Sequence, residues 1–238
     1  MNPIKVLIVE DDADWIKAMT AFLNKEEDML VVGAAASREE AVRLAGTLAF
    51  DVALMDICLT PGRLDGIYAA MELLDLRQAK VIMLSSLEDE AIITQAFTAG
   101  AVQYVLKTDY RMLPETIRGA FRSTNPMEAL LKEFARLKRE EQLQPLTGAE
   151  RELFGLLEEG YSQPQIGRKL FKAESTLKNQ VNKMLKKLRV KSSKEAVEKV
   201  RRGGLMPEAT ERGASDRKDA AGIDRNGERD AMEDVRKE

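Results

Sequence analysis

The chain of 238 residues contains no histidine and a single cysteine, Cys58. The lack of histidine excludes a phosphorelay that passes through a histidine of this chain. One cysteine excludes an internal disulfide framework and is typical of a reducing compartment. No apolar run approaches the length of a membrane span, and the start Met1-Asn2-Pro3 has no signal-peptide pattern. We therefore expect a cytoplasmic protein that does not engage a membrane.

Charge is distributed unevenly along the chain. Residues 1–122 carry 12 Lys and Arg against 19 Asp and Glu, whereas residues 145–202 carry 14 against 7. The length exceeds that of one typical domain. An acidic first part followed by a basic second part predicts two domains, of which the second binds nucleic acid.

Four short apolar runs in the acidic part each end in a polar side chain. The runs cover residues 4–9, 52–55, 81–84 and 102–106, and they are followed by Glu10 and Asp11, Asp56, Ser85 and Lys107. Runs this short and aliphatic are typical of buried parallel strands. A single acid at a strand end is usually a solvated loop residue. Five polar positions in order behind four strands favour one shared pocket, because open α/β sheets carry their chemistry beyond the carboxyl ends of the strands.

The chemistry of this predicted pocket follows from its charges. The carboxylates of Glu10, Asp11 and Asp56 repel one another unless a cation or a proton joins them, and oxygen ligands with room for water and phosphate suit Mg²⁺. We expect Asp11 to hold the metal directly. With the metal, Lys107 and Ser85 to neutralise an incoming phosphoryl group, Asp56 can attack phosphorus and form an acyl phosphate. Asp56 is therefore the predicted phospho-acceptor.

The motifs around these positions belong to one known family. They are Val9-Glu10-Asp11-Asp12, Leu54-Met55-Asp56, Leu84-Ser85-Ser86, and Gly100-Ala101 followed by Tyr104 and Lys107. With these motifs, the chain from residue 3 to 122 resembles the receiver domain of two-component response regulators.

This resemblance implies a fold, a partner and further site residues. The implied fold is doubly wound α/β, with a five-stranded parallel sheet like that of flavodoxin. The implied partner is a histidine kinase that phosphorylates Asp56. The backbone carbonyl of Cys58 would join Glu10, Asp11 and Asp56 as a metal ligand. Tyr104 would act as a switch that swings inward when Ser85 closes on the phosphoryl group.

The loop after Asp56 departs from the family pattern. Residues 57–64 precede Asp65-Gly66, which makes the loop about two residues longer than usual. This length leaves open a receiver-type module that is gated by a protein partner or by abundance, without phosphorylation. A phosphatase or phosphotransferase of the haloacid dehalogenase type is a third interpretation, but Asp56-Ile57-Cys58 lacks the second Asp of that family's pair. We do not expect a metabolic enzyme.

The basic part, residues 145–202, predicts a small all-α domain of four helices. Thr147 with Glu150 gives a capping-box pattern at the start of the first helix. A turn at 171–174 leads into a long basic helix over 175–188. Two helices joined by such a turn, the second of them basic, are the helix-turn-helix arrangement that binds the major groove.

The helix over 175–188 has an apolar face and a polar face. We expect polar side chains of its N-terminal half to reach base edges and the later lysines to contact phosphates. The alternative is an ordinary solvated lysine face, but the acidic domain that precedes it in the same chain makes DNA binding the better interpretation. The expected DNA-binding residues are Thr176, Lys178, Asn179, Gln180, Asn182, Lys183 and Lys187.

Motifs of the basic part point to a second family. They include Leu146-Thr147, Glu150-Arg151-Glu152, Gly160-Tyr161-Ser162, Glu174-Ser175-Thr176-Leu177-Lys178 and Lys187-Leu188-Arg189-Val190. This stretch resembles the LuxR-type helix-turn-helix of the NarL/FixJ class of response regulators. Together the two resemblances imply a regulator of transcription that binds double-stranded DNA and forms a homodimer when it is phosphorylated.

Three positions of this stretch depart from the family. Lys172 stands where an apolar turn residue is usual, Ala173 where a Ser or Thr caps the recognition helix, and Gln180 where a histidine is common. Loss of a cap costs about 1 kcal/mol, so we expect a less firmly seated helix unless Glu174 or Ser175 replaces the cap.

The sequence also predicts a linker and a tail. An apolar stripe of Met127, Leu130, Leu131, Phe134 and Leu137 marks an amphipathic helix, which fits packing on its own receiver and a short dimerising coiled coil equally well. Val197 and Val200 are further candidates for a dimer contact, with packing inside their own domain as the alternative. The expected divisions are a receiver domain at 3–122, a helical linker at 123–144, the helix-turn-helix domain at 145–202 and a disordered charged tail at 203–238.

Overall fold

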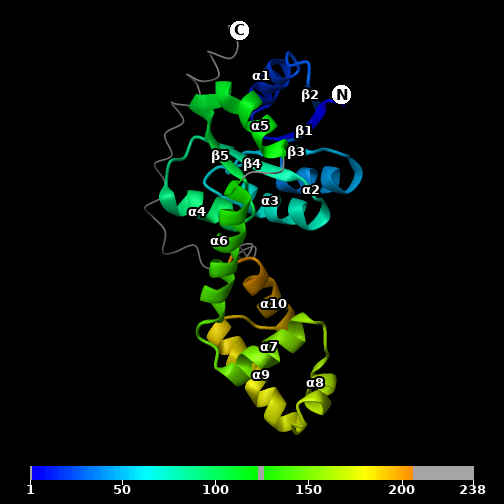
Figure 1. Cartoon of the computed structure of the whole chain (residues 1–238), viewed down its shortest axis with the longest axis vertical. Coiled ribbons are helices and arrows are strands. Elements are labelled where there is room, and N and C mark those ends of the chain that lie inside the picture. Colours follow the sequence, from blue (N-terminus) through cyan, green and yellow to red (C-terminus); the bar gives the residue numbers. More distant parts are fainter. Residues whose placement is uncertain (1, 123–125, 206–238) are drawn as a thin grey trace. The chain divides into compact units, whose positions relative to one another are not determined.

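Five parallel strands form one sheet in the order β2-β1-β3-β4-β5 (Figure 1). The computed structural model describes residues 2–122 and 126–205. The strands are β1 (Ile4–Val9), β2 (Met29–Ala35), β3 (Val52–Met55), β4 (Lys80–Ser85) and β5 (Gln103–Leu106). The predicted doubly wound α/β fold is confirmed. The four apolar runs of the sequence are β1, β3, β4 and β5.

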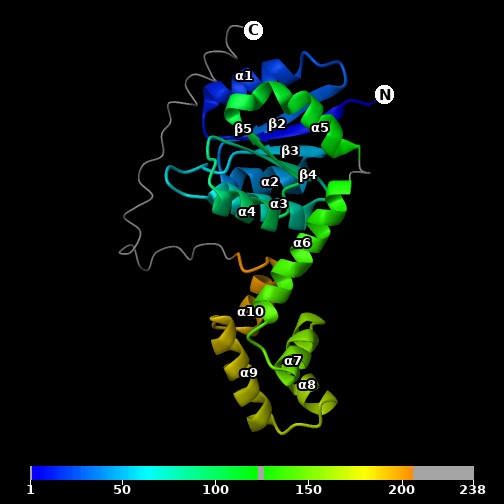
Figure 2. The same ribbon diagram turned by 60° about the vertical axis from the view of Figure 1, so that its left-hand side comes forward.

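Helices cover both faces of the sheet. They are α1 (Ala13–Leu23), α2 (Arg38–Thr47), α3 (Asp65–Leu76), α4 (Glu90–Thr98) and α5 (Leu113–Phe121), with a short 3-10 helix, η1 (Lys107–Met112), before α5. Figures 1 and 2 show α1 and α5 on one face and α2, α3 and α4 on the other. On the α1 and α5 side, alternate residues of the strands, such as Val6 and Ile8, pack with Trp15 and Ile117 into a buried core. The alternation follows from the two-residue period of a strand.

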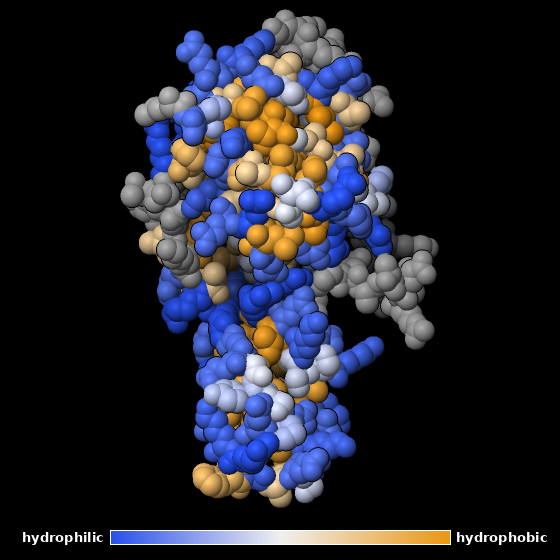
Figure 3. All heavy atoms as spheres, turned by 90° about the vertical axis from the view of Figure 1, so that its right-hand side faces the viewer, coloured by the Kyte–Doolittle hydropathy of each residue, from blue (hydrophilic) through white to orange (hydrophobic). Residues whose placement is uncertain are grey.

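The second unit of the chain is helical. Two compact units are present, and the division lies between residues 132 and 133. The helices are α6 (Pro126–Leu143), which extends across this division, and α7 (Gly148–Glu158), α8 (Gln163–Lys169), α9 (Glu174–Leu188) and α10 (Ser193–Arg201). On the face seen in Figure 3, apolar side chains gather over the first unit, while the second unit shows mostly hydrophilic ones.

The ends of these helices follow the capping patterns of the sequence, with one exception. The capping box of Thr147 and Glu150 is present at the start of α7. Helix α9 begins at Glu174, so Ala173 is its N-cap and accepts no side-chain hydrogen bond. The suggestion that Glu174 or Ser175 replaces the cap is wrong, because both residues already lie in the first turn.

The dimer candidates of the sequence have different surroundings. Val200 is fully buried and Val197 is half-buried in the core of the second unit. In α6, Leu130 is 64% exposed and Leu137 is 53% exposed. The expected tail lies, from residue 206 onward, outside the described residues, as do residues 123–125.

Gly66 is the glycine of the first unit whose replacement by a larger residue should disturb the fold most. A Cβ atom at this position would lie 1.8 Å from the backbone oxygen of Asp56. We expect Gly66→Ala to lower the free energy of unfolding by roughly 2–3 kcal/mol, since α3 must move away from β3. Thermal or urea unfolding of the full chain measures this change.

Gly46 in α2 provides the matched control. A Cβ atom there meets nothing within 4 Å. Because alanine is the better helix former, we expect Gly46→Ala to stabilise the chain by about 0.5–1 kcal/mol. Equal effects of the two substitutions would contradict this account of Gly66.

Candidate functional site

The predicted polar side chains meet at the carboxyl edge of the sheet. Glu10 follows β1, Asp56 follows β3, Ser85 ends β4 and Lys107 follows β5. All four side chains are buried, although all are polar or charged. In the register of the sheet Val9 is paired with Met55, which places Glu10 beside Asp56.

Lys107 forms an ion pair with both buried acids. Its Nζ lies 3.0 Å from Oε2 of Glu10 and 3.2 Å from Oδ2 of Asp56, and the side chain is only 3% exposed. Burial and the charge of Asp56 raise the pKa of Glu10 to about 8, against the lowering effect of Lys107. Burial therefore favours the neutral form of Glu10, which lessens its repulsion with Asp56, and Lys107 is the shared partner of both side chains.

Three carboxylates at this edge could bind a metal ion. Glu10, Asp11 and Asp56 each offer one oxygen, and these oxygens lie within 4.8 Å of one another. Glu10 and Asp56 are buried, whereas Asp11 is exposed. The backbone N–H of Cys58 donates to Oδ1 of Asp56 at 3.3 Å, so the backbone of Cys58 lies beside the same carboxylate. Oxygen donors with one open side fit a hard divalent cation.

Ser85 and Tyr104 are connected through the backbone of Leu87. The backbone N–H of Leu87 donates to Oγ of Ser85 at 3.2 Å, and the hydroxyl of Tyr104 donates to the Leu87 carbonyl at 2.6 Å. Burial raises the pKa of Tyr104 to about 12, so the hydroxyl keeps its proton at neutral pH. Ser85 of β4 and Tyr104 of β5, the residue predicted to close on a phosphoryl group and the predicted switch, thus both bond to the short segment after β4.

The long loop after Asp56 is held by its own hydrogen bonds. The N–H of Gly66 donates to the carbonyl of Ile57 at 3.0 Å, and the N–H of Thr60 donates to Oδ1 of Asp65 at 3.2 Å. Ile57 and Leu59 are buried. With this longer loop, Gly66 packs directly on the backbone of Asp56.

In the second unit, the residues predicted to bind DNA lie on α9. Thr176, Lys178, Asn179, Asn182 and Lys183 are exposed, while Leu177, Val181, Met184 and Leu188 are buried on the opposite side. The predicted division of this helix into an apolar and a polar face is therefore present. The other two predicted residues, Gln180 and Lys187, already bond to other parts of the second unit.

Lys187 bonds to the acid of the capping box. Its Nζ lies 2.6 Å from Oε2 of Glu150, which also accepts from the backbone N–H of Thr147 at 2.8 Å. Burial alone would raise the pKa of Glu150, but the hydrogen bonds from Lys187 and Thr147 outweigh burial and lower it. This pair ties α9 to the start of α7.

Gln180 bonds to the turn that precedes its helix. Nζ of Lys172 donates to Oε1 of Gln180 at 2.9 Å. Both residues depart from the family pattern, and the structure brings the two departures together. The bond ties the turn to α9, whose N-cap is Ala173.

Comparisons with known proteins agree with both halves of this description. The model of the response regulator receiver domain matches residues 6–118, and that of the bacterial regulatory proteins of the luxR family matches residues 144–200. The transcriptional regulatory protein LiaR of Bacillus subtilis (strain 168) is 32% identical over 211 residues, which are 85% of this chain and 99% of LiaR.

The chain belongs to the LuxR-type response regulators.

Two further comparisons cover different shares of this response regulator. The response regulator protein VraR of Staphylococcus aureus (strain NCTC 8325 / PS 47) is 33% identical over 199 residues, covering 82% of this chain and 94% of VraR. The solved response regulator domain of Thermotoga maritima CheB is 33% identical, with a TM-score of 0.48, and covers 52% of this chain and 100% of that chain. As a transcriptional response regulator, the chain is not a metabolic enzyme.

Two side-chain contacts of this response regulator could not be predicted from the sequence. Trp15 presents its ring to Lys107, whose Nζ lies 5.3 Å from the ring centroid. Lys172 is bonded to Gln180. Neither contact has a signal in a single sequence, because the partners are joined only by the fold. Within the part of the chain that the structure describes, no helix is long and apolar enough to cross a membrane.

The Lys172–Gln180 bond should be measurable as a coupling energy. We expect Lys172→Ala and Gln180→Ala to raise hydrogen exchange at the amides of α9, with a coupling energy of roughly 0.5–1 kcal/mol in the double variant. The reason is that either substitution alone already removes the bond. Hydrogen exchange in the full chain measures all three variants.

Lys178→Ala is the control for this cycle, since Lys178 is exposed on the same helix. It should leave exchange at α9 unchanged. A coupling energy that does not differ from zero would show that the two side chains act independently.

Proposed function

We propose that this chain is a DNA-binding response regulator that a histidine kinase switches through Asp56. A carboxylate oxygen of Asp56 attacks the phosphorus of the kinase phosphohistidine, the P–O bond forms, and the P–N bond breaks as the imidazole leaves. The observation that carries the proposal is the buried Lys107 ammonium between Glu10 and Asp56. Such a cation is placed to pair with phosphoryl oxygens as negative charge accumulates.

The metal of the proposed reaction is Mg²⁺. Glu10, Asp11 and Asp56 would hold it with the backbone carbonyl of Cys58, and the ion would neutralise charge on the phosphoryl group. Support for this set comes from the three carboxylate oxygens within 4.8 Å and from the position of Cys58 beside Asp56. Asp11 is the exposed member, so it can take the ion from solvent.

The proposed switch is a shift between two receiver conformations. Phosphorylation gives Lys107 and Ser85 new oxygen partners, which favours a conformation that is rare without phosphate. Tyr104 and Ser85 both bond to the backbone of Leu87, so a movement of Ser85 would shift Leu87 and change its hydrogen bond with Tyr104. The same residues that hold the phosphoryl group would therefore carry its signal out of the site.

The output of the proposed switch is DNA binding by α9. Its exposed polar residues would face the major groove, with Lys178 and Asn179 near base edges and Lys183 near phosphate. Gln180 and Lys187 would join this contact from positions that Lys172 and Glu150 help to fix. We assign this role to a domain at 145–202, the receiver role to 3–122, and linker and tail roles to 123–144 and 203–238. We infer a cytoplasmic location, because the proposed DNA partner lies in that compartment.

Phosphorylation of Asp56 can be tested by intact mass. After incubation with Mg²⁺ and acetyl phosphate, we expect one phosphate adduct on the wild-type chain and none on Asp56→Asn, because the amide is not a nucleophile. The phosphorylated form should then bind promoter DNA more tightly than the Asp56→Asn variant in a mobility-shift titration.

The opposite outcome has a defined meaning. A folded chain that takes no phosphate from acetyl phosphate or from a histidine kinase would favour a receiver gated by a protein partner. Equal DNA affinity of the phosphorylated chain and the Asp56→Asn variant would show that phosphorylation does not control DNA binding.

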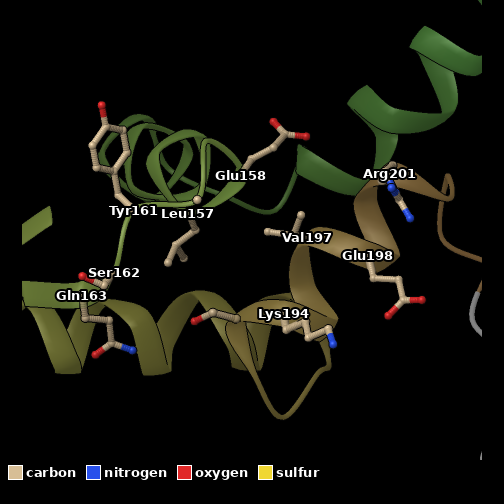
Figure 4. A pocket seen from close by; sticks show the side chains of 11 residues that line it. Leu157, Glu158, Tyr161, Ser162, Gln163, Lys194, Val197, Glu198 and Arg201 are labelled. Atoms are coloured by element: carbon tan, nitrogen blue, oxygen red, sulfur yellow. The ribbon is translucent and has the colours of Figure 1, made fainter. Parts of the chain in front are cut away.

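We further propose that the phosphorylated protein dimerises through α10. A groove of about 660 Å³ lies beside this helix, between the end of α7, the start of α8 and α10 itself (Figure 4). Leu157 and Val197 give it an apolar floor, and Glu158, Lys194 and Arg201 line it with both signs of charge. A two-fold pair of this kind would place two recognition helices on successive turns of DNA. Val200 contributes to the core of the unit rather than to this groove.

The dimer surface can be located with two aspartate substitutions. We expect Val197→Asp to abolish dimerisation of the phosphorylated protein in sedimentation experiments, since it puts a charge into the groove. Leu137→Asp on the exposed stripe of α6 should leave the dimer intact. The reverse result would assign the dimer contact to α6.

A further inference from the structure

Trp15 is the one tryptophan of the chain, and it lies against the phospho-acceptor site. It belongs to the first turn of α1 and is 2% exposed. The ring is 5.3 Å from Nζ of Lys107, measured to its centroid. At this distance the negative face of an indole attracts an ammonium group.

The position of the ring is fixed from two sides. On one side, the side chain of Asp12 accepts from the backbone N–H of Trp15 at 3.2 Å, which ties the residue to the acidic loop after β1. On the other side, the ring meets Tyr110 of η1 edge to face, with centroids 6.4 Å apart and an interplanar angle of 82°. Because η1 begins at Lys107, the ring is fixed to both segments that supply charges to the site.

Packing alone does not account for a tryptophan here. Its Nε1 is buried and has no hydrogen-bond partner among the residues that the structure describes. A buried donor without a partner destabilises the fold, and phenylalanine or leucine would fill apolar space without that penalty. What tryptophan offers beyond them is the most negative aromatic face, which here lies against a desolvated cation.

The chemistry of the site gives this contact a use. The Lys107 ammonium is held by Glu10 and Asp56. It must turn toward phosphoryl oxygens when Asp56 becomes an acyl phosphate. During that transfer one of its carboxylate partners loses charge. An aromatic face keeps attracting the ammonium through the whole step, and it does not compete with phosphate because it carries no formal charge.

We propose that Trp15 is a positioning residue that holds the Lys107 ammonium for phosphoryl transfer to Asp56. This role rests on the proposed phosphorylation of Asp56. A weaker aromatic face should leave Lys107 less well placed and slow the formation of the acyl phosphate.

The single tryptophan allows a test without mutation. Growth on fluorinated tryptophans replaces Trp15 alone in the full-length chain, first with 5-fluorotryptophan and then with 4,5,6,7-tetrafluorotryptophan. Fluorine withdraws electrons from the ring face but changes its shape very little. With Mg²⁺ and acetyl phosphate, we expect the rate of adduct formation to fall steadily with fluorine number, by about three- to tenfold for the tetrafluoro ring.

A second measurement detects the contact itself. The loss of thermal stability on fluorination should be larger in the wild-type chain than in Lys107→Met, where the cation is absent. A purely structural tryptophan would give the same loss in both backgrounds. Trp15→Leu is the variant without an aromatic face, and Trp15→Phe should restore part of its lost rate.

The outcomes separate this role from the proposed function. An unmodified chain that takes no phosphate overturns phosphorylation of Asp56 and the role of Trp15 with it. Normal phosphorylation at rates that do not depend on fluorine overturns the role of Trp15 alone. A graded rate together with fluorine-dependent stability that vanishes in Lys107→Met supports it.

Discussion

Two carboxylates that are buried side by side repel each other unless a cation or a proton offsets their charge, and in the first unit the cation is Lys107. Its ammonium lies 3.0 Å from Glu10 and 3.2 Å from Asp56, at the point where three strands end. The contact joins residues that are 97 and 51 positions apart in the chain. It therefore depends on the parallel sheet, and in our proposal the transfer of a phosphoryl group to Asp56 depends on this contact in turn. The indole of Trp15 completes this arrangement on the apolar side of the ammonium.

Long-range polar contacts also organise the second unit. Lys187 reaches Glu150 of the α7 capping box, and Lys172 reaches Gln180 within the helix-turn-helix. These bonds position α9 although its N-cap is an alanine. They also engage part of its polar face, because Lys187 and Gln180 bond to partners within the unit. The helix is basic for two reasons, DNA recognition in our proposal and attachment to its own domain.

The structure explains two of the positions at which the sequence departs from the family pattern. Lys172 and Gln180 look like two unrelated substitutions in the sequence, yet they form one hydrogen bond. The longer loop after Asp56 is the departure that leaves open a receiver gated without phosphorylation. In the fold, Gly66 still packs on the backbone of Asp56, and the loop closes through bonds of its own.

The sequence by itself determined the strands, the order of the two domains and the candidate residues at the strand ends. Apolar runs bounded by polar residues report burial directly, and capping residues act on their nearest neighbours, so both signals are local. Strand β2 was not singled out, because its apolar run does not end in one of the polar residues that mark the site. Tertiary structure alone decided which lysines are free to meet a ligand, which valine of α10 is core, and which ring lies against Lys107. Those properties depend on contacts with residues elsewhere in the chain, and a single sequence does not show how close such residues lie in space.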